Sequence, residues 1–247
     1  MAIVEYSGGI NRMSGSIAGH TYGYQHDCNC VRSRTKPVDK NNANQQKIRS
    51  AFSGLSTRWA QTLTDEQRAD WAAYGDGVTL PNRLGAQVHV YGYQHYLRSN
   101  VIRLQSGLPI IDNGPAVMEI PAADPTLAVT VDEFSQEMYV TFNNALDWAN
   151  EDGGYMFIYQ GRPMNHQREF FAGTWRLCNY IEGDAVTPPV SPDPELCVFA
   201  VAENQHQFIY ARISRADGRL SEQFRSDGFR GESYADGHDL TLVRSDR

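Results

Sequence analysis

Long apolar runs are absent from this sequence of 247 residues. A membrane-spanning helix needs about 18 or more consecutive apolar residues, and no such run occurs here. The opening residues, MAIVEYSGG, also lack the basic start and the apolar stretch of a signal peptide. We therefore expect a soluble protein that is made in the cytoplasm and has no membrane anchor.

Cysteine is scarce, with four residues, so we expect reduced thiols rather than the dense disulfide framework of a small secreted protein. Cys28 and Cys30 share a predicted strand face with His26 and form a conceivable ligand pair, but no second pair has the spacing of a zinc site. Cys178 and Cys197 fall in separate predicted strands, where packing and pairing across a sheet both stay open. We expect no bound metal or cofactor.

Catalytic signatures are missing too. The sequence contains no phosphate-binding GxxxxGK followed by Ser or Thr, no dinucleotide-binding GxGxxG after a strand, no GxSxG elbow and no HExxH. His166 and His206 lie in polar loop sequence, where exposure or an ordinary hydrogen bond accounts for an imidazole. We expect the protein not to be an enzyme.

Charges of the two signs are unevenly distributed. Residues 1–115 contain twelve Lys and Arg against eight Asp and Glu, and residues 116–247 contain ten against twenty-one. The net charge of −7 argues against wholesale nucleic-acid binding. The basic excess of the first half lies in one segment, at Arg32, Arg34, Lys36, Lys40, Lys47 and Arg49. This segment favours docking to a polyanion or to an acidic protein, and a solvated basic face is the alternative.

The first forty residues are rich in Gly, Ser and Asn and poor in apolar side chains, which is typical of a segment that cannot fold alone. The string SGGINRMSGSIAGHTYGYQ contains short strand-like pieces separated by glycine. We predict that residues 1–40 form an extended arm that orders mainly against a neighbouring surface, and that Pro37 stops it before a helix begins.

Residues 41–107 have helical periodicity. An apolar stripe with helical spacing consists of Ile48, Phe52, Leu55, Trp59 and Leu63. Asn41, Asn42 or Asn44 can cap the start of this helix. A capping box of Thr64 and Gln67 begins a second helix, which Gly75 can end, and the two helices are predicted to form a hairpin. A third helix ending at Gly107 is predicted from the stripe of Tyr93, Leu97, Val101 and Leu104.

Residues 108–126 carry four prolines and are predicted to be a linker at a domain boundary. In residues 127–230 the apolar period becomes two, with six or seven β-rich runs that predict an antiparallel β-sandwich. Residues 231–247 are expected to be a loosely held tail. The predicted fold class is α+β, in which an extended Gly-rich arm and a small helical segment precede the sandwich.

Two heptapeptides, HTYGYQH at 20–26 and HVYGYQH at 89–95, agree at six of seven positions. The histidines of one copy lie about 20 Å apart on a strand and about 240° apart around a helix, so one metal ion cannot bind both unless the copies meet. The first copy is predicted to be a strand and the second to enter a helix. We interpret each as an aromatic packing or interface face, with four anchors: Tyr22, Tyr24, Tyr91 and Tyr93.

The string VRSRTKPVDKNNANQQKIRSAFSGLSTRWAQTLTDEQRADWAAYG resembles a family of uncharacterised proteins encoded in tailed bacteriophages and prophages. The matching positions are Lys36, Pro37, Val38, Gln45, Arg49, Phe52, Trp59, Leu63, Thr64, Gln67, Arg68 and Trp71. The resemblance covers roughly residues 10–110 and implies a phage structural module, without established catalytic residues. The chain departs from the family at residues 39–41, Asp-Lys-Asn, where members more often have Asn-Pro.

The second half is similar to fibronectin type III-like and immunoglobulin-like sandwiches. The string FIYARISRADGRLSEQF resembles their final hairpin, around Asp217 and Gly218. A resemblance of this kind implies a fold rather than a function.

Together these features lead us to expect a bacteriophage virion protein that is made in the host bacterial cytoplasm and binds other virion proteins and copies of itself. Arg32, Arg34 and Lys36 are the expected docking residues. Capsid decoration or cementing is the first expected location, and neck or tail is the second. Two alternatives stay open: an adhesion module in which Trp148 stacks on host glycan instead of folding back over the sandwich, and nucleic-acid contact by residues 31–49.

Overall fold

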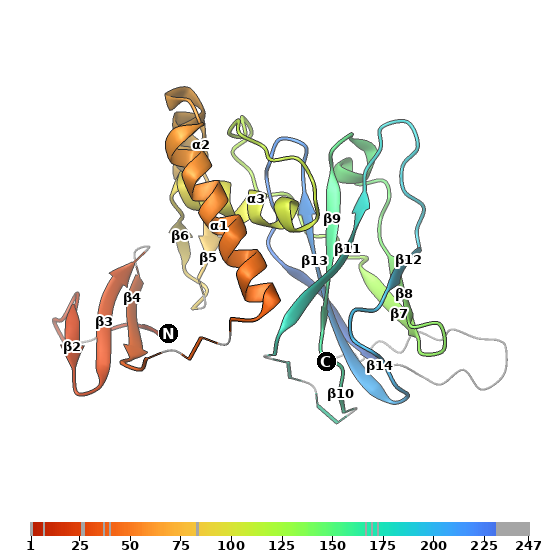
Figure 1. Cartoon of the computed structure of the whole chain (residues 1–247), viewed down its shortest axis with the longest axis horizontal. Helices are drawn as coiled ribbons and strands as arrows, with labels where there is room; N and C mark the ends of the chain where they lie inside the picture. Colours follow the sequence, from red (N-terminus) through yellow and green to blue (C-terminus); the bar gives the residue numbers. More distant parts are fainter. Residues whose placement is uncertain are drawn as a thin grey trace. The chain divides into compact units, whose positions relative to one another are not determined.

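The computed structural model describes most of the chain, namely residues 2–6, 8–25, 28–36, 38–39, 41–82, 84–165, 167–168, 170–171 and 173–230. The chain divides into two compact units, residues 1–119 and 120–247, and Figure 1 shows the elements of each. The described residues form three α-helices and several antiparallel sheets, so the fold class is α+β. The predicted tail, residues 231–247, and the predicted helix-stopping Pro37 lie outside the described residues.

Unit 1 begins with a sheet of four antiparallel strands in the order β1-β4-β3-β2. They are β1 (Ala2–Val4), β2 (Gly15–Ile17), β3 (His20–Gln25) and β4 (Cys28–Ser33). Ala18 and Gly19 turn the chain from β2 to β3 with positive φ angles of 47° and 79°, the conformation of a tight hairpin turn. The extended arm expected from the sequence is therefore corrected to a small sheet, because its strand-like pieces satisfy their backbone groups by pairing with one another.

Three helices follow, α1 (Ala43–Gln61), α2 (Asp65–Gly77) and α3 (Gly92–Gln105), and all three were predicted. Where the sequence indicated only a loop, two short strands, β5 (Thr79–Pro81) and β6 (Gln87–His89), pair between α2 and α3. The side chain of Asn82 holds their turn, since its oxygen accepts from the N–H groups of Leu84 and Ala86.

The starts of α1 and α2 are closed by reciprocal hydrogen bonds. Asn42 caps α1 by accepting from the N–H of Gln45, whose side chain accepts from the N–H of Asn42. Thr64 and Gln67 form the predicted capping box at the start of α2. After the last turn of α3, Gly107 has a φ of 75°, which is the left-handed conformation that ends many helices.

The helices of unit 1 pack around the ring of Tyr96. This side chain is fully buried, and its ring centroid lies 5.2 Å from that of Trp59 on α1 and 5.7 Å from that of Trp71 on α2. Because α3 contacts both other helices, it is buried on more than its one predicted stripe. The prediction that α1 and α2 form a hairpin is corrected, since these two helices pack on α3 rather than along each other.

The apolar stripe of α1 is covered along only part of its length. Leu55 and Leu63 are buried, whereas Ile48 and Phe52 are each 43% exposed. A helical stripe ordinarily faces a core. The aromatic rings of α3, Tyr93 and Tyr96, contact α1 at Trp59. The apolar side chains nearer the start of α1 therefore remain partly exposed to solvent.

Glycine allows the closest backbone contacts in unit 1. A Cβ on Gly92 would lie 2.3 Å from the carbonyl oxygen of Trp71, and one on Gly114 would lie 2.5 Å from the nitrogen of Trp71. A Cβ on Gly75 would lie 2.6 Å from the carbonyl oxygen of Val90. No side chain fits at these distances, so α2, α3 and residue 114 touch backbone to backbone around Trp71.

The proline-rich segment 108–126 is partly packed onto the helices, which corrects the prediction of a linker. Both backbone groups of Ile111 pair with the side-chain amide of Asn100, at 2.8 and 2.9 Å. The indole nitrogen of Trp71 donates to the carbonyl of Asp112 at 2.9 Å. Buried polar groups need such partners, so only the later part of the segment contains the boundary between the units, after residue 119.

Unit 2 consists of two antiparallel sheets. The smaller has the order β12-β8-β7, and the larger has the order β10-β13-β9-β11 with β14 also paired to β13. The strands are β7 (Ala128–Asp132), β8 (Glu137–Thr141), β9 (Tyr155–Gly161), β10 (Met164–Asn165), β11 (Trp175–Glu182), β12 (Asp193–Leu196), β13 (Gln205–Ser214) and β14 (Phe224–Arg230). A short 3-10 helix, η1 (Asp147–Asn150), precedes β9.

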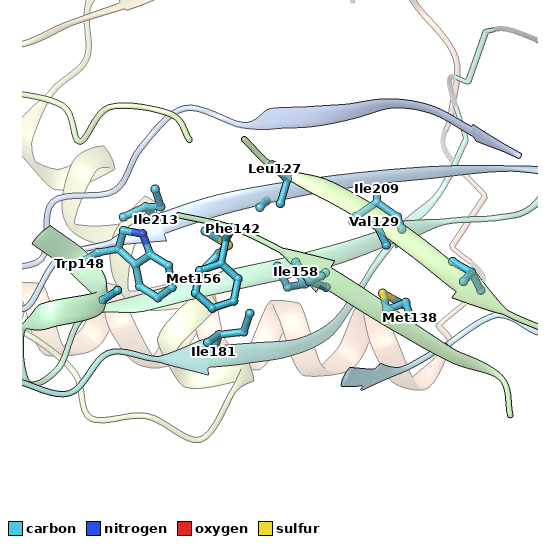
Figure 2. Packing of buried hydrophobic residues seen from close by; sticks show 14 of the residues in the cluster. Leu127, Val129, Met138, Phe142, Trp148, Met156, Ile158, Ile181, Ile209 and Ile213 are labelled. Atoms are coloured by element: carbon cyan, nitrogen blue, oxygen red, sulfur yellow. The ribbon is translucent and has the colours of Figure 1, made fainter. Parts of the chain in front are cut away.

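The two sheets of unit 2 share one hydrophobic core (Figure 2). Val129 and Met138 of the smaller sheet belong to the same buried cluster as Ile158 and Ile209 of the larger sheet. Along β7 and β8 every second residue is buried, as the sequence period of two predicts. Strand β9 is buried on both of its faces, which its sequence period did not reveal.

Gly23 and Gly92 occupy the same position in the two heptapeptides, so they give a matched test of the backbone packing around Trp71. Gly92→Ala should lower the free energy of unfolding of unit 1 by about 1–3 kcal/mol or more, because its methyl group overpacks the contact with Trp71. Gly23→Ala should change it by less than about 0.5 kcal/mol, because nothing lies within 4 Å of that Cβ. Urea unfolding followed by the helical circular dichroism signal measures both, and equal losses would refute the packing role.

Candidate docking surface

Strand alternation gives the first sheet two unlike faces. Tyr22 pairs with Val31 across β3 and β4, so their side chains point to the same side, and Tyr24 lies two residues further along that side. Ile17 of β2 pairs with His20 and lies on this side too. We call Ile17, Tyr22, Tyr24 and Val31 the tyrosine face.

The opposite face is closed at its cysteines. Cys28 and Cys30 are buried, and the sulfur of Cys28 accepts a hydrogen bond from the side chain of Asn82 at 3.2 Å. Within the described part of the chain, no group of three or more His, Cys, Asp or Glu could hold a metal ion. His26, the third member of the conceivable ligand set, lies outside the described residues.

The tyrosine face is open. Ile17 is 62% exposed and Tyr24 is 36% exposed. The guanidinium carbon of Arg12 lies 3.8 Å from the centroid of the Tyr24 ring, in the position of a cation–π contact. The face therefore combines apolar and aromatic surface with a cation, as interface anchors do.

A basic strip, which we define as Arg32, Arg34 and Lys36, continues from the end of β4. All three side chains are exposed, and among the described residues none of them forms an ion pair. The N–H of Arg34 donates to the carbonyl of Gly19 at 2.7 Å, which fixes the start of the strip beside β3. Positive charge without an internal partner is available to an external one.

The remaining basic residues of the segment differ from the strip. Arg49 makes two hydrogen bonds to the carboxylate of Asp39, at 2.9 and 3.0 Å, and its charge is thereby balanced. The guanidinium of Arg49 is also the main cause of the lowered pKa of Asp39. Lys40 lies outside the described residues. Lys47, on α1, donates to the carbonyl of Gln105 and forms no ion pair among the described residues. The docking charge of this segment near the first sheet thus rests on the strip itself.

The four predicted tyrosine anchors belong to two separate elements. Tyr22 and Tyr24 lie on β3, whereas Tyr91 and Tyr93 lie at the start of α3. Tyr91 is 71% exposed. Tyr93 instead takes part in helix packing, since its hydroxyl lies 2.7 Å from that of Ser56 and its ring meets Trp59 edge-on. Tyr93 is therefore the weakest of the four candidates.

The residues that carry the phage-family resemblance fall into two groups. Most have an internal role in capping or packing, such as Arg68, whose guanidinium donates to the carbonyl of Trp59 at 2.9 Å. Among the described matching positions five are exposed, and two of these have an internal partner, since Arg49 pairs with Asp39 and Thr64 caps α2. The other three are Lys36, Val38 at 86% and Phe52 at 43%. Folding does not account for these three, so they extend the candidate docking surface. Sequence reasoning had treated Phe52 as part of a packing stripe.

Trp148 is not available to a glycan, so the alternative of a glycan contact is wrong, and the interpretation that this residue folds back onto unit 2 is confirmed. The side chain is 1% exposed and belongs to the core of unit 2, where Figure 2 shows it beside Phe142. Their ring centroids are 5.4 Å apart. Because η1 turns the chain inward before β9, the tryptophan of this loop folds back over the sheets.

The other candidate residues have ordinary structural surroundings. Cys178 and Cys197 are free thiols that pack against the core, and burial raises the pKa of Cys178 to about 12 and that of Cys197 to about 11. The ring nitrogen Nδ1 of His206 lies 2.8 Å from the carbonyl oxygen of Arg168. His166 lies outside the described residues.

No family model, curated protein or solved structure matches this chain. No helix in the part that the structure describes is long and apolar enough to cross a membrane.

Glu195 of β12 is a buried carboxyl. It is 5% exposed, and its Oε2 accepts from the side-chain amide of Asn179 on β11 at 2.8 Å. Burial raises the pKa of Glu195 to about 7, and the neighbouring Asp193 adds to the rise while Asn179 opposes it. The carboxyl group thus joins the edges of the two sheets, and below pH 7 it does so mainly in its protonated form.

His95 of α3 is a buried imidazole. It is 2% exposed, its ring centroid lies 5.0 Å from that of Tyr74, and its Nε2 has no hydrogen-bond partner among the described residues. Burial, and after it the charge of Arg98, lowers the pKa of His95 to about 4. At neutral pH the side chain is therefore an uncharged packing group.

Unit 2 should lose stability as the pH rises. Unfolded Glu195 ionises near its ordinary pKa of 4.5, whereas the folded carboxyl stays protonated up to about 7, so stability present below pH 4.5 declines through that window by up to about 3 kcal/mol. Glu195→Gln should remove most of this decline. Urea unfolding at about pH 5 and about pH 8, followed by near-ultraviolet circular dichroism, measures it. The same slope in both proteins would contradict the assignment.

Unit 1 should respond with the opposite sign. The unfolded imidazole of His95 takes up a proton near pH 6.5, but the folded one does so only near 4, so the helices should lose up to about 3 kcal/mol as the pH falls through this window. His95→Gln should flatten the acid limb of the helical circular dichroism transition. An unaltered acid limb would show that another group causes it.

Proposed function

We propose that this chain is a non-enzymatic structural protein of a bacteriophage particle, attached through its first sheet and helical segment. The observation that carries the proposal is the first sheet, which presents the open tyrosine face on one side and Arg32, where the basic strip begins, on the other. Cys28 and Cys30 are its only core residues among those described. Such a sheet buries too little apolar surface to be stable without a further partner.

Attachment to a repeating shell suits a surface of this kind. Strands β1 and β2 are edges of the sheet, and unpaired edges and apolar faces are ordinarily covered in the working form of a protein. A single small contact of this sort is weak, but a particle that presents many identical sites supplies avidity. Capsid decoration or cementing is therefore the first location that we propose, and neck or tail is the second.

The phage assignment is supported by the resemblance in residues 31–75. Within it, the exposed Lys36 belongs to the basic strip, the exposed Val38 lies two residues further on, and the exposed Phe52 lies on α1. None of the three has an internal role that explains it. They are the residues that an attachment function, rather than folding, would require.

We further propose that unit 2 is a fibronectin type III-like β-sandwich. Leaving aside the two-residue β10, the first, second and fifth strands form one sheet, and the third, sixth and seventh lie together in the other. This is the division of strands in immunoglobulin-like sandwiches. The fourth strand, β11, pairs with β9 rather than with β12, which favours the fibronectin type III variant.

Co-sedimentation with empty phage capsids tests the attachment. Deleting residues 1–40 should abolish it, and Tyr22→Ser combined with Tyr24→Ser should weaken it at least about tenfold, since central aromatic anchors carry much of an interface. Arg162→Glu, an exposed charge reversal in unit 2, is the control and should bind as the unchanged protein does.

Three results would count against the proposal. Capsid binding that survives the deletion of residues 1–40 would place the docking surface elsewhere. An equal loss of capsid binding in the Arg162→Glu control would mean that the total charge of the protein determines binding. Binding of bare DNA that falls steeply with salt and is lost in Arg32→Glu combined with Arg34→Glu would favour the nucleic-acid alternative instead.

A further inference from the structure

The most exposed large apolar side chain of the described residues is in unit 2, at the tip of the β7–β8 hairpin. Phe134 is 95% exposed. Its loop is ordered by Asp132, whose carboxylate accepts from the N–H of Phe134 and from the hydroxyl of Ser135, both at 2.9 Å. Phe134 is thus held outward by a closed turn.

A second clamp fixes the same loop to the body of unit 2. Gln136 has a φ of 58°. Its side-chain amide donates to the carbonyl of Val201 at 2.9 Å and accepts from the N–H of Val201 at 2.8 Å. The amide also donates to the carbonyl of Glu133. A rigid loop loses little conformational entropy on binding, which favours its use as a preformed contact.

The charges around Phe134 have one sign. Asp132 and Glu133 precede it and Glu137 follows it in the hairpin. No cationic side chain belongs to residues 127–137. The tip therefore presents an aromatic side chain that is flanked in sequence by three carboxylates.

Unit 1 contains a groove of complementary character between α1 and α3. It is open, has a volume of about 540 Å³, and is lined by small and apolar side chains that include Ala51, Thr57, Leu104 and Ile110. Gly54 lies in its wall with nothing within 4 Å of its Cβ position.

A lysine marks one end of the groove. The ammonium group of Lys47 donates to the carbonyl of Gln105 at 3.0 Å, and within the described residues it forms no ion pair. The other cation of the groove, Arg58, is paired with Asp112. An acidic ligand would therefore be drawn to the Lys47 end.

We infer that Phe134 of one copy inserts into the groove of a second copy, with the carboxylates of the hairpin tip facing Lys47. The groove volume lies in the range of about 300–1,000 Å³ that ligand pockets have, which leaves room for an aromatic side chain, and the charges of the hairpin tip and of Lys47 are opposite. We call Phe134 at the hairpin tip the knob. Because knob and groove are different surfaces of the same chain, the contact is head-to-tail and joins copies into a ring or a row.

The contact is small and accordingly weak. A hairpin tip buries less than the roughly 1,200 Å² of a standard interface, so the association belongs at high protein concentration or in an array where copies are already held close. It goes beyond the proposed attachment, since it concerns purified copies without any particle.

Sedimentation velocity of the full chain at low ionic strength, over about 10 μM to about 1 mM, tests the contact. The unchanged protein should associate. Phe134→Ser should weaken association at least tenfold, and so should Gly54→Leu, which fills the groove where space is open. Val186→Ser alters another exposed apolar residue, 85% exposed, and should leave association unchanged.

Mixing the two defective proteins is the decisive arm. Phe134→Ser retains a groove and Gly54→Leu retains a knob, so each alone should be monomeric and their mixture should form a one-to-one dimer that grows no further. Lys47→Glu should weaken association, and Glu133→Lys in the same chain should restore it.

The inference is overturned if the unchanged protein stays monomeric, if Val186→Ser weakens association as much as Phe134→Ser, or if the mixture forms no dimer. Circular dichroism confirms that each variant is folded. Since no capsid is present, a failure here leaves the attachment experiment unaffected, and the reverse also holds.

Discussion

Unit 1 depends on backbone-to-backbone contact around Trp71. Gly92 and Gly114 bring two other segments against the main chain of α2 at distances that admit no side chain. The indole nitrogen of Trp71 also donates a hydrogen bond to the carbonyl of Asp112, in the proline-rich segment 108–126. This close approach also places the ring of Tyr96 between two tryptophans. Packing at interior density leaves no slack for rearrangement, so the three helices have one well-defined arrangement.

Much of the helical segment could be predicted from the sequence because its signals are local. The spacing of apolar residues and the capping box of Thr64 and Gln67 act over a few residues, and the structure confirms both. The packing of residues 108–126 onto the helices could not be predicted, because their prolines indicate an irregular backbone without indicating what that backbone packs against. Asn100, which binds Ile111 in both directions, carries no sign of this role in its neighbours along the chain.

The candidate docking surface was predictable only in part, and the reason is burial. The period of β3 placed Tyr22 and Tyr24 on one face, and the charges of Arg32 and Arg34 followed from composition. Whether an aromatic residue faces solvent is decided by distant chain segments, so Trp148 was assigned to the surface as an alternative and lies in the core. The exposure of Phe134 was not predicted either. A phenylalanine between two predicted strands resembles a core residue, and only the geometry of the turn shows that it points outward.

The capping box of α1 has a consequence for how such a protein can vary. Asn42 and Gln45 satisfy each other's backbone groups, so the capping box needs no residue before 42, although Asp39 and Asn41 also contact the first turns of the helix. A different leading segment joined at that point would leave helix initiation intact. The first sheet is in this sense separable from the helices, because the capping box of α1 belongs to the residues that follow the sheet.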